Sequence, residues 1–143
     1  MNSLIGDNDG ATLKLHEISE DGIRQLIDAF YAKVRVDPHL APVFERAITG
    51  DWGPHLATMR DFWSSIMLTS GRYNGNPLAV HLRIEGMAPQ LFDQWLKLFG
   101  ETCAEIFDDS VASAFRVKAE RIAESLKLAL FYRADRAHMR SLS

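Results

Sequence analysis

The most informative stretch of the chain is YNGNPLAVHL, residues 73–82. Its Asn-Gly pair favours a tight turn, and Pro77 is well placed as the first residue of a short helix. That helix carries His81 on a face shared with apolar residues, and Gly86 is expected to end it. A histidine on an apolar face is most often a hydrogen-bonded core residue, although it can also be a metal or cofactor ligand. The stretch alone leaves both interpretations open.

Helical periodicity extends on both sides of this stretch. Apolar residues recur at spacings of three and four in four long segments, and two shorter segments lie between them. No segment alternates polar and apolar residues for long enough to form a convincing strand. The sequence therefore predicts an all-α fold, with helices over about residues 19–36, 40–46, 52–68, 77–85, 89–106 and 109–130.

Length and composition indicate one domain with a substantial core. The 143 residues match an ordinary single domain, and 47% hydrophobic with 24% charged residues is typical of a globular protein. Residues 1–17 lack periodicity and are rich in Gly, Asp and Asn, so we expect a flexible N-terminal extension or a loosely docked arm. Residues 18–143 are expected to form the domain itself.

The charge pattern argues against nucleic-acid binding, and the hydropathy pattern argues against a membrane protein. The net charge is −3, whereas a nucleic-acid binder normally carries a basic excess. The basic cluster of Arg133, Arg136 and Arg140 is interpreted as a solvated helix end. No apolar run reaches the length that spans a bilayer, and the first residues do not resemble a signal peptide. We therefore expect a soluble, cytoplasmic protein.

Sequence motifs of common enzyme classes are missing. The sequence has no glycine-rich phosphate loop, no paired cysteines at zinc spacing and no nucleophile elbow. Asp108 and Asp109 stand at a predicted helix start, where capping is a more frequent role than acid–base catalysis. Cys103 falls in the apolar register of its helix, which indicates a buried and unreactive thiol.

Two of the five histidines, His55 and His81, share helix faces with apolar residues. The others lie in polar or terminal stretches and are expected to be solvated: His16, His39 and His138. An all-α chain of this size can pack around a haem with one axial histidine, and three Trp and eight Phe could line it. Tyr31 and Trp95 also lie on apolar faces yet carry polar hydrogens, which could bond to backbone carbonyls or to a bound ligand.

Six short motifs, in their order and spacing, resemble the truncated haemoglobins, and among them group III. They are FYxKVR (30–35), PVF (42–44), WxxH (52–55), FW (62–63), YNGxPLxxHL (73–82) and FxxWLxLF (92–99). The resemblance covers about residues 18–130, and YNGxPLxxHL is its most specific part. It implies a two-over-two helical sandwich, a shortened globin fold, around haem b.

The resemblance also implies roles for individual residues. His81 would be the proximal iron ligand. Tyr31, His55 and Trp95 would lie on the distal side and stabilise a bound ligand, although family members differ in whether the histidine ring points at that ligand. Phe44 would pack against the haem edge. The other residues expected to contact haem are Met59, Phe62, Trp63, Tyr73, Leu78, Arg83, Phe92 and Ile122, of which Tyr73 and Arg83 could reach the propionates.

The activity implied by the resemblance is binding of O₂, NO and CO at a five-coordinate iron in a polar distal pocket. A firmly held O₂ suits redox chemistry such as NO dioxygenation, and turnover would need electrons from a separate reductase. The sequence leaves open whether the protein is an enzyme. It also leaves open whether His55 ligates the iron. Two alternatives are a cofactor-free helical interaction module and a haem-based gas sensor that acts through a partner.

Overall fold

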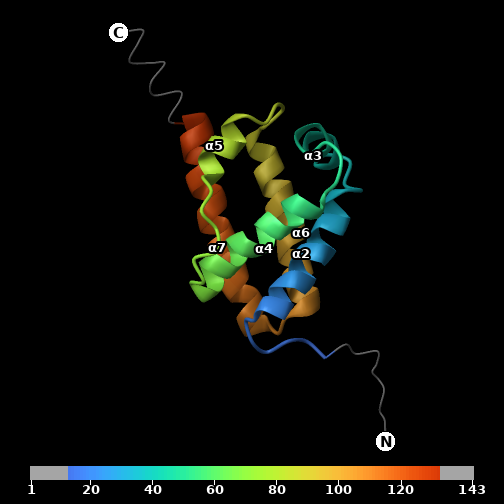
Figure 1. Ribbon diagram of the computed structural model, residues 1–143, viewed down its shortest axis with the longest axis vertical. Coiled ribbons are helices and arrows are strands. Elements are labelled where there is room, and N and C mark those ends of the chain that lie inside the picture. The colour runs from blue at the N-terminus through green and yellow to red at the C-terminus, as the bar shows by residue number, and fades with distance from the viewer. Residues whose placement is uncertain (1–12, 133–143) are drawn as a thin grey trace, which may run out of the picture.

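The computed structural model describes residues 13–132, and its regular elements over that range are all helical (Figure 1). This confirms the predicted fold class. The elements are α2 (Glu20–Val34), α3 (Ala41–Ala47), α4 (Gly53–Leu68), α5 (Pro77–Leu82), α6 (Pro89–Ile106), α7 (Asp109–Lys127) and η1 (Leu128–Tyr132). η1 is a π-helical continuation of α7, which the apolar spacing had not distinguished from the end of that helix.

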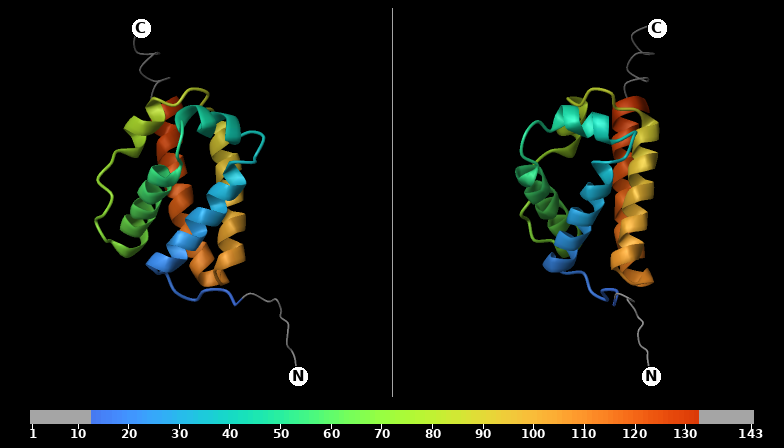
Figure 2. Two further views of the ribbon diagram at one scale, coloured as in Figure 1. Left: turned by 45° about the vertical axis from the view of Figure 1, so that its right-hand side comes forward. Right: turned by 90° about the vertical axis from the view of Figure 1, so that its right-hand side faces the viewer.

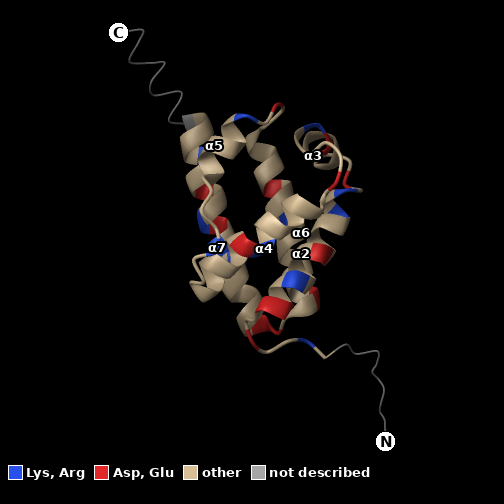
Figure 3. Cartoon of the chain, in the orientation of Figure 1, with Lys and Arg blue, Asp and Glu red and all other residues tan. Residues whose placement is uncertain are grey.

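Each long helix begins where the sequence supplies a cap or a proline. The Ser19 side chain accepts a hydrogen bond from the Gly22 backbone N–H (3.0 Å) at the start of α2. Asp108 caps α7 in the same way through the Val111 N–H (2.9 Å), as predicted. α4 and α6 instead carry a proline in the first turn, where an N–H would have no intrahelical acceptor. Acidic residues in the first turn of α2, red in Figure 3, complement its dipole.

The long helices form two layers of two. In Figures 1 and 2, α6 and α7 run antiparallel and side by side in one layer, while α2 and α4 form the other. α2 packs against both α4 and α6, so it joins the two layers. The short helices α3 and α5 lie at the same end of this sandwich. The arrangement is the two-over-two sandwich that the resemblance implied.

The core consists of the inward face of α2 and of stacked aromatic rings from its neighbours. Five residues of α2 are completely buried: Ile23, Leu26, Ile27, Phe30 and Val34. Phe99 of α6 stacks on Trp63 of α4 and on Trp95, with ring centroids 4.9 and 5.0 Å apart. Complete burial of one large apolar side chain contributes about 1.5–3 kcal/mol, so these contacts hold α4 and α6 firmly against α2.

The end of the expected N-terminal extension is bonded to the fold. The Leu15 N–H donates to the Ile106 carbonyl (2.9 Å), and the Leu15 carbonyl accepts from the Asp108 N–H (3.0 Å). His16 Nδ1 also lies 2.7 Å from the Asp108 carboxylate, although its side chain is largely exposed. These partners are available because the α6–α7 junction leaves backbone groups without helical hydrogen bonds. At Leu15 and His16, these bonds fit a docked arm, which was the second of the two expectations, rather than a flexible extension.

Some expectations fall on residues that the structure does not describe. These are residues 1–12 of the extension, and Arg133, Arg136, His138 and Arg140 near the other end of the chain. Among the helices between residues 13 and 132, none combines the length and apolar character needed to cross a membrane.

Candidate functional site

A cavity of about 550 Å³ lies among the helices and receives side chains from both layers and from α3 and α5. This volume is in the range of small-molecule and cofactor sites. The structure brings together at its wall almost all of the predicted site residues: Tyr31, Phe44, His55, Met59, Phe62, Trp63, Tyr73, His81, Arg83, Phe92, Trp95 and Ile122. Leu78 is the exception, because it packs against a small cluster of Phe92, Ala123 and Leu126 instead of lining the cavity.

The cavity wall also contains residues that were not among the predicted site residues. They are Leu40, Val43, Arg46, Ala47, Ile48, Thr58, Pro77, Val80, Ile84, Met87, Leu91, Ala123 and Leu126. Helical spacing could have found part of this set, since residues four apart share a face. Leu40 and Ile48 flank Phe44 at that spacing, Leu91 precedes Trp95 by four, and Leu126 follows Ile122 by four.

The geometry of His81 leaves one ring nitrogen free to bind a metal. Nδ1 lies 2.7 Å from the carbonyl oxygen of Pro77, at the start of the same helix, α5. A carbonyl can only accept, so Nδ1 carries the proton, and Nε2 of the neutral ring keeps its lone pair. The same arrangement fixes ring orientation in metal-binding histidines. His81 therefore meets the chemical requirement for an axial ligand, even though α5 contains no fully buried residue.

Tyr31 and Trp95 place two hydrogen-bond donors at the cavity wall. Tyr31 is only 3% exposed, and burial raises the pKa of its hydroxyl. The nearby indole N–H of Trp95 opposes the rise in pKa. Both rings contact Phe30 edge-on, with centroids 4.8 and 5.2 Å apart, and Trp95 also stacks on Phe99. Tyr31 consequently stays protonated, and packing restricts both donors to one orientation.

His55 is a buried polar group without a partner. Its Nε2 is buried and makes no hydrogen bond to any described residue. The ring is surrounded edge-on by Tyr31 at 5.1 Å, Trp52 at 5.6 Å and Phe44 at 6.3 Å between centroids. Burial lowers the pKa of His55, which favours the neutral ring. An unpaired buried nitrogen is costly, so it marks a place where a bound molecule could supply the missing partner.

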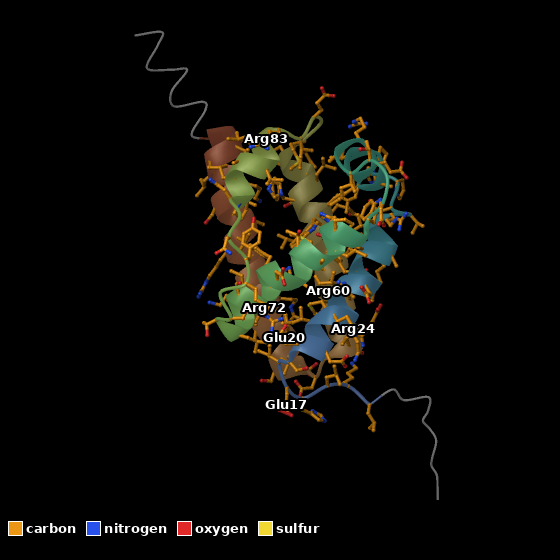
Figure 4. The ribbon with its side chains drawn as sticks, in the orientation of Figure 1. Glu17, Glu20, Arg24, Arg60, Arg72 and Arg83 are labelled. Carbon is orange, nitrogen blue, oxygen red and sulfur yellow. The ribbon has the colours of Figure 1, made fainter. Side chains whose placement is uncertain are left out.

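Two arginines line the cavity without a carboxylate partner among the described residues. They are Arg83, next to α5 in Figure 4, and Arg46 of α3. Between residues 13 and 132, no Asp or Glu lines the cavity. The Arg46 guanidinium lies so close to Gly86 that a Cβ there would be 2.7 Å from it, and Gly86 also has a φ of +86°. Two guanidinium groups without an acid suit a ligand with carboxylates.

The loop between α4 and α5 holds Tyr73 at the cavity wall. Its backbone N–H donates to the Ser65 hydroxyl (2.9 Å), and its ring packs edge-on against Phe62 with centroids 5.1 Å apart. The loop folds so tightly over this ring that a Cβ on Gly75 would lie 2.5 Å from the Tyr73 hydroxyl oxygen. Arg72 and Glu20, both labelled in Figure 4, pair at 3.4 Å and join the loop to the start of α2.

These observations fit a haem. The apolar wall would enclose the macrocycle, and the free ring nitrogen of His81 would bind the iron. The hydrogen-bond donors of Tyr31 and Trp95 lie in the same cavity. The guanidinium groups of Arg46 and Arg83 could bind the propionates. A two-over-two helical sandwich with such a cavity defines a protein of the truncated globin class.

Comparison with known proteins gives the particular family. No protein-family model matches the chain. The chain is 34% identical over 122 residues to a group 3 truncated haemoglobin of Campylobacter jejuni, a match that covers 83% of this chain and 96% of the relative. The crystal structure of the group III truncated haemoglobin from Campylobacter jejuni superposes with a TM-score of 0.80 over the same shares of the two chains. The chain belongs to the group 3 truncated haemoglobins.

Membership in this family implies a haem and the binding of diatomic ligands. It favours the haem interpretation over the alternative of a cofactor-free interaction module.

Proposed function

We propose that this protein binds haem b through His81 and binds O₂, NO or CO at a five-coordinate iron. We further propose that it uses these ligands in redox chemistry of O₂ and NO. The observation that carries the proposal is the 2.7 Å contact between His81 Nδ1 and the Pro77 carbonyl, on the wall of a cavity of cofactor size. That contact orients the Nε2 lone pair and selects the tautomer that an iron ligand needs.

The residues that would hold the cofactor fall into three groups. His81 would ligate the iron, and Phe44, Met59 and Phe92 belong to the apolar wall that would enclose the ring. Arg83, Tyr73 and the unpredicted Arg46 are the candidates for the propionates. The haem, when bound, supplies the open iron position at which a diatomic ligand binds.

Tyr31 and Trp95 would donate hydrogen bonds to the bound diatomic. O₂ takes on negative charge in such a site, and a hydrogen bond to a charged acceptor contributes about 1.5–3 kcal/mol. Two such bonds would slow O₂ release by about a hundredfold or more, since 1.4 kcal/mol is a factor of ten. Slow release suits redox chemistry better than O₂ carriage.

His55 would stay off the iron in this proposal. Its ring is packed edge-on against Tyr31, Phe44 and Trp52, and its lowered pKa keeps it neutral. A neutral ring in this position could donate to or accept from a bound ligand through Nε2.

The reaction we propose is oxidation of NO by the O₂-bound protein, with electrons from a separate reductase that restores the ferrous state. Consumption of NO over many cycles should therefore depend on added reductase. Continuous turnover without any electron donor would contradict this part of the proposal.

The test is an absorption spectrum of the purified protein after haem addition, compared with the spectra of His81→Ala and His39→Ala. The wild type and His39→Ala should both give a sharp Soret band and bind CO in the ferrous form. His39 is a suitable control because it is exposed and does not line the cavity. His81→Ala should lose or markedly change the band. An unchanged spectrum in a folded His81→Ala protein would contradict the ligand assignment.

A further inference from the structure

The side chain of Asp37 joins three elements that carry cavity residues. It lies between α2 and α3 and is buried. One carboxylate oxygen accepts the backbone N–H groups of His39 (3.0 Å) and Leu40 (2.9 Å), just before α3. The other oxygen accepts the side-chain amide of Gln94 in α6 (2.7 Å). The carboxylate therefore fixes the end of α2, the start of α3 and the first half of α6 relative to one another.

Each of these elements contributes to the distal part of the proposed site. α2 carries Tyr31, α3 carries Phe44, and α6 carries Trp95, the residue directly after Gln94. Successive residues on a helix point in directions about 100° apart. Gln94 can therefore face the corner between α2 and α3 while Trp95 packs against Phe30 and Phe99.

The hydrogen bond between Gln94 and Asp37 limits the movement of α6 relative to the end of α2. Stacking on Phe99 fixes the plane of the Trp95 ring, but an apolar stack tolerates sliding of the helix by a fraction of an ångström. A hydrogen bond does not tolerate such sliding, because donor–acceptor distances in hydrogen bonds span a range of only about 0.5 Å. A short bond between α6 and the end of α2 therefore limits how far the indole N–H can move from the Tyr31 hydroxyl.

We propose that Asp37 and Gln94 form a positioning pair that sets the distance between the Trp95 indole and the Tyr31 hydroxyl, and through it the strength with which a diatomic ligand is held. This inference rests on the proposed function, since it assigns the two donors to the ligand. Neither Asp37 nor Gln94 lines the cavity, so the pair acts through Trp95 and Tyr31.

The experiment uses Gln94→Met, which keeps the length of the side chain and removes the amide donor. Gln25→Met is the matched control, because the Gln25 amide donates to Asp21 (2.8 Å) within α2, where the Asp21 side chain is exposed. Two quantities are measured in the haem-loaded proteins. One is the NMR shift of the Trp95 indole N–H in the diamagnetic ferrous CO form, assigned with Trp95→Phe. The other is the O₂ dissociation rate.

Gln94→Met should shift the Trp95 indole resonance and raise the O₂ dissociation rate severalfold, by less than Trp95→Phe does. In the double variant Gln94→Met/Trp95→Phe, the rate should equal that of Trp95→Phe alone, because the pair has no other route to the ligand. Gln25→Met should change neither quantity.

Three results would count against the inference in different ways. An indole resonance that does not move in Gln94→Met overturns the positioning role. Additive rates in the double variant also overturn it, because Gln94 would then act on the ligand by some route other than Trp95. A shifted resonance with O₂ dissociation unchanged in both single variants would instead overturn the ligand role of Trp95 in the proposed function, and the coupling of the pair to the ligand would fall with it.

Discussion

Replacing Tyr31 with phenylalanine removes one hydroxyl from the cavity and leaves the aromatic contacts of the side chain in place. The ring packs on Phe30, Phe44, Trp52 and His55, with centroids between 4.8 and 6.2 Å away. Phenylalanine preserves each of these contacts, so the variant should fold like the wild type. The change therefore isolates the hydroxyl as a donor to a bound ligand.

The expected magnitude follows from the chemistry of that one bond. A hydrogen bond to a charged acceptor is worth about 1.5–3 kcal/mol, so Tyr31→Phe should raise the O₂ dissociation rate about 10- to 100-fold. CO carries little negative charge when bound, and its dissociation rate should change much less. Burial raises the pKa of Tyr31, so the hydroxyl should remain protonated, and wild-type O₂ release should show no tyrosine titration up to about pH 10.

The assay is stopped-flow displacement of O₂ by CO from the ferrous protein. Thr102→Val is a matched control, since it removes a buried hydroxyl that donates to the Leu98 carbonyl (2.7 Å) and does not line the cavity. The control should leave O₂ release unchanged even if it lowers stability. If Tyr31→Phe and the wild type release O₂ at the same rate, Tyr31 is not a donor to the ligand and the reasoning fails.

Three further predictions concern the fold. Phe99→Ala should lower the free energy of unfolding by about 3–5 kcal/mol, measured in urea, because Phe99 is fully buried and stacked on Trp63 and Trp95; a loss below 1 kcal/mol would contradict this packing. Burial alone would raise the pKa of Asp37, but hydrogen bonds from Leu40, Gln94 and His39 hold it below its ordinary value. Because the pKa of Asp37 is lower in the folded than in the unfolded protein, where it is about 4, the ionised carboxylate stabilises the fold above about pH 4. This stabilisation is lost as the pH falls from about 4 through the pKa of the folded protein. The free energy of unfolding in urea should therefore drop over this pH range, and it should drop by less in Asp37→Asn. Burial raises the pKa of the Cys103 thiol to about 12, so it should react with a thiol reagent only after unfolding, and rapid labelling of native protein would contradict its burial.

The helices could be predicted from the sequence because their signals are local. Ser19, Pro77, Pro89 and Asp108 mark helix starts by rules that need no knowledge of the rest of the chain, and each stands within one residue of an observed start. The apolar stripe of α2 predicted its buried face for the same reason. The cavity residues that were predicted came mostly from the family resemblance, which supplies the spacing between distant motifs.

Features that depend on contacts between distant segments could not be predicted in this way. The pairing of Leu15 with the α6–α7 junction uses backbone groups, which leave no pattern in the side chains. Asp37 could be identified as a helix terminator before Pro38, but nothing local indicates that its carboxylate reaches Gln94. Arg46 lines the cavity and lies against the turn at Gly86, a contact between distant segments that no local pattern indicates. Leu78 shares a short helix with His81 but packs against Phe92, Ala123 and Leu126. Six residues are too few for their spacing to predict which face of a helix points into the cavity.

The six-residue helix α5 contains no fully buried residue, although it carries the histidine on which the proposed site depends. Leu78 packs this helix against Phe92, Ala123 and Leu126, whereas α2 and α6 carry side chains that are completely buried in the core. If the cavity holds a haem as proposed, we expect its loading and loss to involve opening of α5 rather than unfolding of the helical sandwich. Backbone amides of α5 should exchange with solvent far faster in the apoprotein than in the loaded form, while those of α2 keep their protection in both.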